Sequence, residues 1–195
     1  MELPLANASL EGTIPLTMRI RQVTLLFACL GIALAPAQEE EAKAFEFVPL
    51  VVESSLFSDQ VKMMTKERDE YATNLAIFAG NFVIERKASA LSLETAKRML
   101  AVALHLSPRN RNALVIGFQL KKGIFPEARK ADYSPAVLSR LLLSRGRLLS
   151  QEEAEDGKLL ARCFVEIAAI IDPRNEDAVF EFEIQRLDHG DVDWE

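Results

Sequence analysis

One 15-residue pattern occurs twice in this chain, at residues 96–110 and 161–175, with an offset of 65 residues. Each copy carries small and apolar residues at helical spacing and ends in the tripeptide Pro-Arg-Asn. A proline disfavours the helical conformation in the residue before it, and an asparagine can cap the helix that follows. The pattern therefore predicts, twice, a helix, a tight turn and a new helix, with small residues where neighbouring helices approach closely.

Apolar residues recur at helical spacing through most of the chain after residue 58. We expect helices at about 59–87, 93–106, 111–122, 135–146, 150–171 and 176–188. The expected N-caps are Ser92, Asn110, Ser134, Ser150 (in a capping box with Glu153) and Asn175. The expected helix ends include Gly123, Gly146 and Gly190, and Gly80 either interrupts the first helix or allows a close helix contact. The predicted fold class is all-α over residues 59–190, with antiparallel helix pairs stacked as a short solenoid or packed as an irregular helical bundle.

The repeated segment resembles the second helix of a tetratricopeptide repeat (TPR). That family places Ala, a large apolar residue, Ala and Pro at fixed spacings. The first copy matches with Ala96, Leu100, Ala103 and Pro108, and the second with Ala161, Val165, Ala168 and Pro173. An offset of 65 residues is close to two units of about 34, although the middle unit, residues 111–146, lacks the terminal proline. The resemblance implies a short TPR-like solenoid that binds a protein partner between stacked helices, with a polar capping helix at its end. The charged last helix fits that capping role, with Glu176, Asp177, Glu181, Glu183, Arg186 and Asp188.

Residues 18–37 have the three parts of a secretory signal peptide. A basic start at Met18–Arg21 precedes an uncharged apolar run, which ends in Ala35-Pro36-Ala37. We expect cleavage near Ala37 and an extracytoplasmic location, periplasmic or secreted. The alternative is an uncleaved N-terminal helix that anchors the protein, although the apolar run is shorter than the about 20 residues that span a bilayer. Residues 1–17 lack a basic start, and we expect translation to begin at Met18 rather than at Met1.

Two short segments flank the predicted helical domain. Residues 38–58 are expected to be a spacer or an extended segment packed on the domain. Residues 191–195 are expected to be an acidic tail. Trp194 either extends with this tail or folds back on the domain. The alternating acids of this tail lack the glycine and the distal glutamate of a calcium loop.

The charge and the residue types argue against several classes of function. The formal net charge is −6, which disfavours nucleic-acid binding, because that needs clustered Lys and Arg. The densest basic group is Lys121, Lys122, Arg129 and Lys130, which predicts a solvated surface rather than an anion site. The two histidines, His105 and His189, and the single cysteine beyond the leader, Cys163, do not form a zinc-binding pattern. We expect Cys163 to be a buried apolar residue and His105 to lie at the surface or at the boundary of the core.

No phosphate loop, nucleophile elbow or metalloprotease helix occurs in the sequence. We therefore expect no catalytic, cofactor-binding or metal-ligating residues, no cofactor and no enzyme activity. The predicted function is an exported, non-enzymatic helical-repeat domain that mediates protein–protein interaction. The alternative is a membrane-anchored structural helical bundle that acts as an assembly or spacer component, in contact with a membrane only if the leader is retained.

Overall fold

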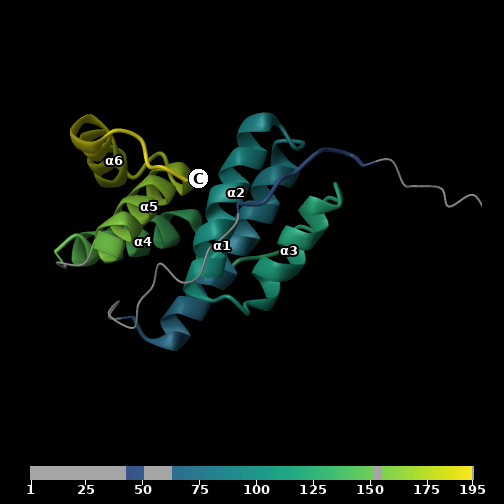
Figure 1. Ribbon diagram of the computed structural model, residues 1–195, viewed down its shortest axis with the longest axis horizontal. Coiled ribbons are helices and arrows are strands. Elements are labelled where there is room, and N and C mark those ends of the chain that lie inside the picture. The colour runs from purple at the N-terminus through teal and green to yellow at the C-terminus, as the bar shows by residue number, and fades with distance from the viewer. Residues whose placement is uncertain (1–42, 51–62, 152–154, 195) are drawn as a thin grey trace, which may run out of the picture. The chain divides into compact units, whose positions relative to one another are not determined.

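The computed structural model describes residues 43–50, 63–151 and 155–194. These residues form six helices and no strand (Figure 1), which confirms the all-α fold class. The helices are α1 Thr65–Glu85, α2 Ala90–Leu106, α3 Arg111–Lys121, α4 Pro135–Leu149, α5 Glu155–Ile171 and α6 Glu176–His189. The predicted leader and the segment before it lie outside the described residues.

Three of the predicted N-caps are confirmed. The side chains of Asn110, Ser134 and Asn175 accept hydrogen bonds from backbone amides in the first turns of α3, α4 and α6. At the end of α6, Gly190 has a φ of 73°, a left-handed conformation in which glycine carries no steric cost. These starts and this stop follow from local chemistry, and the sequence therefore places them correctly.

Two predicted serine caps are wrong. The N-cap of α2 is Ser89 rather than Ser92, because α2 begins directly after the turn that contains Lys87 and Ala88. Ser92 is buried within α2, and its hydroxyl donates to the Ser89 carbonyl at 2.8 Å. Ser150 is the C-cap of α4 rather than the N-cap of α5, and its expected partner Glu153 lies outside the described residues.

Two predicted helix boundaries also differ. The first helix was expected to begin at about Asp59, but α1 begins at Thr65. Met63 and Met64 are not helical, and Met64 is the N-cap, with an extended backbone. The fourth helix continues past Gly146 to Leu149. Gly146 is buried, and a Cβ on it would lie 3.1 Å from the Ala161 carbonyl oxygen of α5. This glycine therefore permits a close approach of two helices instead of ending one.

Gly80 plays the second of its two predicted roles. It lies within an unbroken α1, and a Cβ on it would lie 3.2 Å from Pro126 and 3.5 Å from Ile116 of α3. The missing side chain lets α3 and the α3–α4 linker pack closely on α1.

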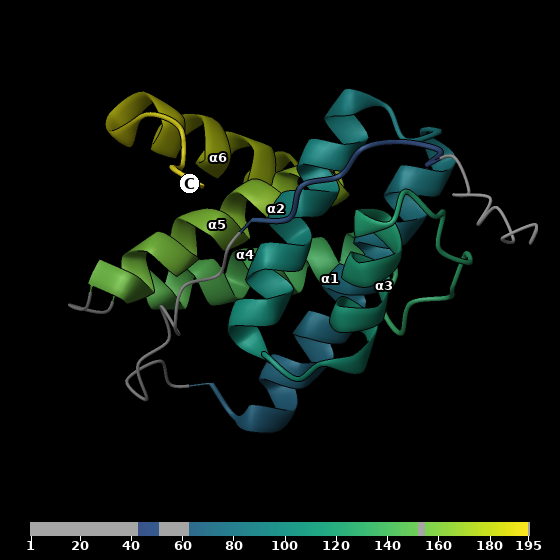
Figure 2. The ribbon, with the colours of Figure 1, turned by 45° about the vertical axis from the view of Figure 1, so that its right-hand side comes forward.

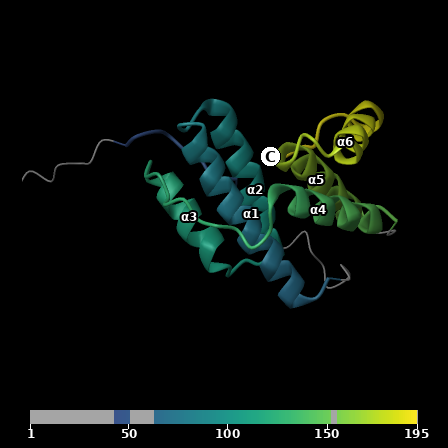
Figure 3. The ribbon, with the colours of Figure 1, turned by 180° about the vertical axis from the view of Figure 1, so that it is seen from behind.

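The helices pack as two antiparallel pairs, α1 with α2 and α4 with α5, and each pair carries a third helix. Helix α3 packs mainly on α1, and α6 packs mainly on α5. Figures 1 and 3 show α3 and α6 on opposite sides of the four paired helices. The same grouping is visible in Figure 2, where α3 lies beside α1 and α6 lies beside α5.

The 65-residue offset of the sequence pattern extends to the helices themselves. Helix α5 begins and ends 65 residues after α2, and α6 begins 65 residues after α3. Equivalent positions are buried in both copies, as in Ala96 with Ala161, Met99 with Phe164, and Ala103 with Ala168. The described chain is thus a tandem pair of three-helix units, α1–α3 and α4–α6.

Residues 43–50 form neither helix nor strand and pack near the end of α3. The Ala44 amide donates to the Gly123 carbonyl at 3.2 Å, and the Phe45 ring meets the Phe125 ring edge-on at 5.0 Å. Phe47 is buried. Gly123 has a φ of 73°, and a Cβ on it would lie 2.7 Å from the Phe45 carbonyl oxygen, so this residue must lack a side chain for the segment to pack here.

Candidate functional site

The expected structural role of Cys163 fits its surroundings in α5. Its side chain is buried, and burial, assisted by the charge of Glu166, raises the pKa of its thiol to about 12. A thiol with that pKa is protonated near neutral pH and is a poor nucleophile. His105 is half-buried near the end of α2, and burial lowers its pKa. Within the described ranges, no group of three or more His, Cys, Asp or Glu side chains is placed to hold a metal ion.

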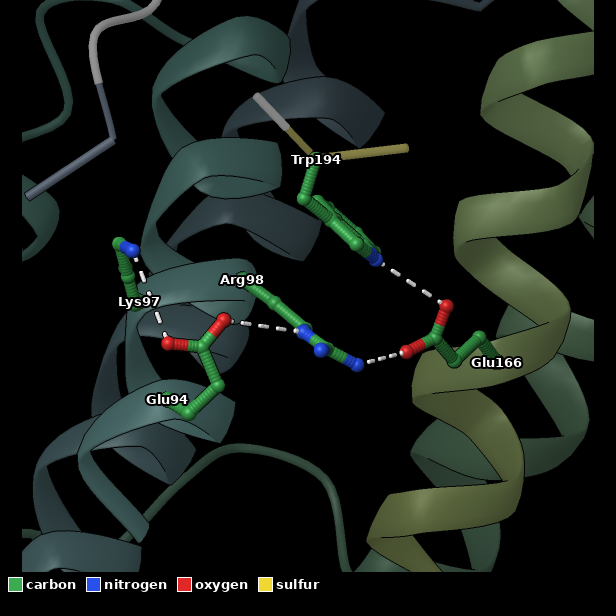
Figure 4. Close-up of polar contacts among 5 residues, drawn as sticks. All are labelled: Glu94, Lys97, Arg98, Glu166 and Trp194. Atoms are coloured by element: carbon green, nitrogen blue, oxygen red, sulfur yellow. Dashed lines mark hydrogen bonds and ion pairs between the residues drawn. The ribbon is translucent and has the colours of Figure 1, made fainter. Parts of the chain in front are cut away.

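A network of charged side chains joins the two three-helix units (Figure 4). At its centre is Glu166 of α5, which is only 3% exposed. Its Oε1 accepts from Arg98 Nη1 of α2 at 2.5 Å, and its Oε2 accepts from Trp194 Nε1 at 3.2 Å. Arg98 also approaches Glu94 at 3.4 Å, and Glu94 pairs with Lys97 at 3.6 Å.

This network also holds the segment that follows α6. The Trp194 ring lies 5.8 Å from the Arg98 guanidinium, which is within cation–π range. Arg162 Nη2 of α5 donates to the Gly190 carbonyl at 2.7 Å. Trp194 is therefore folded back against α2 and α5.

A pocket of about 280 Å³ lies beside the network, lined by Arg98, Glu166, Phe182, Asp191 and Val192. Both carboxylate oxygens of Glu166 already accept hydrogen bonds from Arg98 and Trp194. These two bonds fix the position of the Glu166 carboxylate between the two three-helix units. The groups here bring α2, α5 and the C-terminal segment together.

The outer face of α6 carries an apolar stripe. Phe180, Ile184 and Leu187 follow each other at spacings of four and three residues, which places them on one side of the helix. They are 66%, 41% and 73% exposed. On the other side of the helix, Ala178 is fully buried, and Val179 and Phe182 pack against the core. We call Phe180, Ile184 and Leu187 the α6 stripe.

Acidic side chains border the α6 stripe. Glu176 and Asp177 lie at its N-terminal end and Asp188 at its C-terminal end, and all three are exposed. Glu181 forms an ion pair with Arg147 of α4, and Glu183 forms an ion pair with Arg186 of α6. Helix α6 is thus charged, as the sequence indicates, but its expected role as a polar cap is wrong, because three large apolar residues occupy its outer face.

Helix α3 also exposes an apolar surface. Leu114, Val115 and Phe118 are 50%, 37% and 62% exposed, and they share one side of the helix. We call these three residues the α3 stripe. The opposite side of α3, with Ala113, Ile116 and Leu120, is buried.

Basic side chains border the α3 stripe. Arg111 precedes it, Lys121 and Lys122 follow it, and all three are exposed. Residues 111–122 contain no acidic residue. The Lys122 ammonium lies 5.8 Å from the Phe118 ring. Two members of the basic group noted in the sequence, Lys121 and Lys122, thus lie at the edge of an apolar surface.

The sequence reasoning missed both stripes, although their spacing is readable. Apolar residues on both sides of a short helix indicate that one side packs inward and the other is exposed, but they do not say which side is which. Only the positions of α1 and α5 decide that question.

In the part of the chain that the structure describes, no helix combines the length and the apolar character needed to cross a membrane.

No protein family, no curated protein and no solved structure matches the chain.

Proposed function

We propose that this chain is an exported, non-enzymatic helical-repeat domain that binds a protein partner through the α6 stripe. The observation that carries this proposal is the outward orientation of Phe180, Ile184 and Leu187 on a helix whose other side packs on α5. A contiguous group of large exposed apolar side chains, rimmed by polar residues, is typical of an interaction surface. Full burial of each of these side chains contributes about 1.5–3 kcal/mol, before the cost of association is subtracted.

The charges around the α6 stripe define the partner that fits it. Glu176, Asp177 and Asp188 border the stripe at both ends. A helix that inserts apolar residues beside them is favoured when its own border carries Lys or Arg, because opposite charges steer association and fix the register. The proposed partner therefore presents an amphipathic helix with a basic border.

The repeat supports an interaction domain of the TPR-like type. The small residues that carry the resemblance, Ala96 and Ala103 in α2 and Ala161 and Ala168 in α5, are buried. They lie where α2 packs on α1 and where α5 packs on α4. Stacked helical units of this kind present extended surfaces and bind proteins in many unrelated contexts.

Binding to two synthetic helical peptides tests the proposed surface. Both peptides carry the same leucine stripe, which is bordered by lysine in one and by glutamate in the other, and binding is measured by fluorescence anisotropy with the full chain. We expect the lysine-bordered peptide to bind at least about tenfold more tightly. The substitution Leu187→Ser should abolish this preference, because it removes the most exposed residue of the stripe.

Leu91→Ser is the matched control, since Leu91 is also a largely exposed leucine, 65% against 73% for Leu187, but lies on α2. This variant should bind like the unchanged chain. Equal affinity for the two peptides, or equal binding by the Leu187→Ser and Leu91→Ser variants, would contradict the proposal.

Export is tested by the N-terminal sequence and cell fraction of the protein recovered from its host. We expect a chain that begins at Gln38 in a soluble extracytoplasmic fraction. A chain that retains residues 18–37 in the membrane fraction would instead support the anchored bundle. A chain that retains those residues in the cytosol would contradict export.

A further inference from the structure

The α3 stripe and the α6 stripe occupy equivalent positions in the two three-helix units. Each lies on the third helix of its unit, and α6 begins 65 residues after α3. Each also faces away from the helix pair that carries it. One chain therefore presents two apolar helix faces, and the two helices that carry them lie on opposite sides of the paired helices (Figure 3).

The borders of the two stripes carry opposite charges. Residues 111–122 contain three basic and no acidic residues, whereas α6 contains five acidic residues and one arginine. Like charges across a contact are unfavourable, and opposite charges are favourable. Two α6 helices would therefore repel each other, and so would two α3 helices, whereas α3 and α6 attract.

The spacing of the charges matches as well. Arg111 and Lys121 are ten residues apart, on either side of the α3 stripe. Asp177 and Asp188 are eleven residues apart, on either side of the α6 stripe. At a rise of 1.5 Å per residue, the two charge pairs span about 15 Å and about 16.5 Å. Both ends of α3 can thus meet acids of α6 while Leu114 and Phe118 contact the α6 stripe.

We infer that the partner of the α6 stripe is the α3 stripe of a second copy of this chain, in a head-to-tail contact. This inference rests on the proposed function, because it identifies the partner of the same surface. The contact joins two different faces, so one copy keeps its α3 stripe free and the other keeps its α6 stripe free, and each can bind a further copy. The assembly therefore grows with concentration into chains or closes into a ring.

Two variants separate the two faces. Phe118→Glu places a negative charge in the α3 stripe, opposite the acids of α6. Leu187→Lys places a positive charge in the α6 stripe, opposite the basic residues of α3. Both side chains are largely exposed, so both variants should fold, and circular dichroism with urea unfolding verifies it.

Sedimentation velocity measures the association. The full chain should increase in mass with concentration, and each variant alone should remain a monomer. An equimolar mixture of the two variants should form a heterodimer, because each supplies the face that the other lacks. Asp188→Lys, on the border, should weaken self-association about two- to fivefold, and association should weaken as the salt concentration rises.

Other results would overturn the inference in distinct ways. Self-association of Phe118→Glu alone would indicate pairing of two α6 helices, and self-association of Leu187→Lys alone would indicate pairing of two α3 helices. A full chain that stays monomeric at every concentration would show that the α3 stripe and the α6 stripe do not bind each other. In that last case, preferential binding of the lysine-bordered peptide would still support the proposed function. If the chain neither self-associates nor prefers that peptide, the proposed function is contradicted as well.

Discussion

At the scale of single residues, the turns depend on backbone conformations that few residue types adopt. Gly123 and Gly190 both have a φ of 73°, where glycine is favoured. Lys87 and Ala88, between α1 and α2, adopt positive φ values of 51° and 52° without being glycine. The α1–α2 turn therefore carries strain that packing of the adjacent helices must offset.

Gly123→Ala should destabilise the domain by about 2 kcal/mol, since it combines a left-handed residue with a steric clash. A Cβ at this position would lie 2.7 Å from the Phe45 carbonyl oxygen. Gly117→Ala is the matched control in the neighbouring helix, where a Cβ meets nothing within 4 Å, and it should stabilise by about 0.5–1 kcal/mol. Urea unfolding of both variants checks this, and equal effects would refute the proposed tight contact at Gly123.

The buried thiol of Cys163 should make stability depend on pH above about pH 9. Burial raises its pKa from 9.0 to about 12 in the native protein, while in the unfolded chain the thiol ionises near its ordinary value. Between these values the unfolded state binds fewer protons than the native state, so stability falls as pH rises, by at most about 1.4 kcal/mol per pH unit. Below pH 9 this contribution is fully present.

Urea unfolding at about pH 8 and about pH 10, for the unchanged chain and Cys163→Ala, measures this dependence. We expect the unchanged chain to lose more stability over this interval than the variant. Tyr71 adds a similar loss at higher pH, since burial and then Glu67 raise its pKa to about 12. Parallel pH dependences for the two proteins would contradict the prediction for Cys163.

At the scale of the helices, the two repeated asparagines each cap one helix and bind another. Asn110 Oδ1 accepts from the Ala113 amide of α3, and its Nδ2 donates to Thr73 and Asp69 of α1 at 2.7 and 2.9 Å. Asn175 Oδ1 accepts from the Ala178 amide, and its Nδ2 donates to Ser139 of α4 at 2.8 Å. The repeat in the sequence thus preserves a link between the third helix and the first helix of each unit.

Asn110→Ala should cost more stability than Asn175→Ala. Asn110 is 4% exposed and loses its cap together with two part-buried bonds to α1, for which we expect about 2–3 kcal/mol. Asn175 is less buried and loses its cap and one bond to α4, for which we expect about 1–2 kcal/mol. Chemical denaturation gives both values, and the reverse order would show that the bonds to α1 contribute little.

The sequence predicted the elements better than their exposed faces. Asn110, Ser134 and Asn175 were identified as caps because a cap depends on a few neighbouring residues. Ser150 was assigned to the wrong helix because a serine between two helices can serve either one. The α6 stripe was missed because the five acidic residues of the same helix suggested a wholly polar outer surface.

At the scale of the whole described chain, side chains rather than close backbone packing join the two three-helix units. Arg145 of α4 forms a two-point contact with Glu67 of α1, with nitrogen–oxygen distances of 3.1 and 2.5 Å. Tyr71 of α1 meets Phe164 of α5 edge-on at 6.2 Å. Arg98 and Glu166 form a second charged contact. Removal of one partner from any of these contacts should therefore lower the stability of both three-helix units.

Arg98→Ala should destabilise the protein by about 2 kcal/mol, because Glu166 then keeps a buried carboxylate without its cation. Arg98 itself is 33% exposed, which places the effect below that of a fully buried pair. The fluorescence of Trp194, the single tryptophan of the chain, should shift to longer wavelength as its contact with Arg98 is lost. Urea unfolding and the emission spectrum check the two effects.

Lys97→Ala is the control at the adjacent position, since Lys97 pairs with the half-exposed Glu94 at 3.6 Å. Its effect should stay within about 0.5 kcal/mol, and the emission of Trp194 should not change. A similar loss of stability in both variants would show that the Arg98–Glu166 contact does not join the units.

The sequence by itself determined the helical class, the starts of α3, α4 and α6, and the 65-residue repeat. These features depend on local spacing and capping, which act over a few residues and need no knowledge of the neighbours. Only the tertiary structure decided that α3 packs on α1 and α6 on α5, that Glu166 is buried against Arg98 and Trp194, and that Phe118 and Leu187 are exposed. An apolar residue on a helix has the same local preference whether it faces a core or a partner. Its role therefore depends on which other helices come to lie beside it.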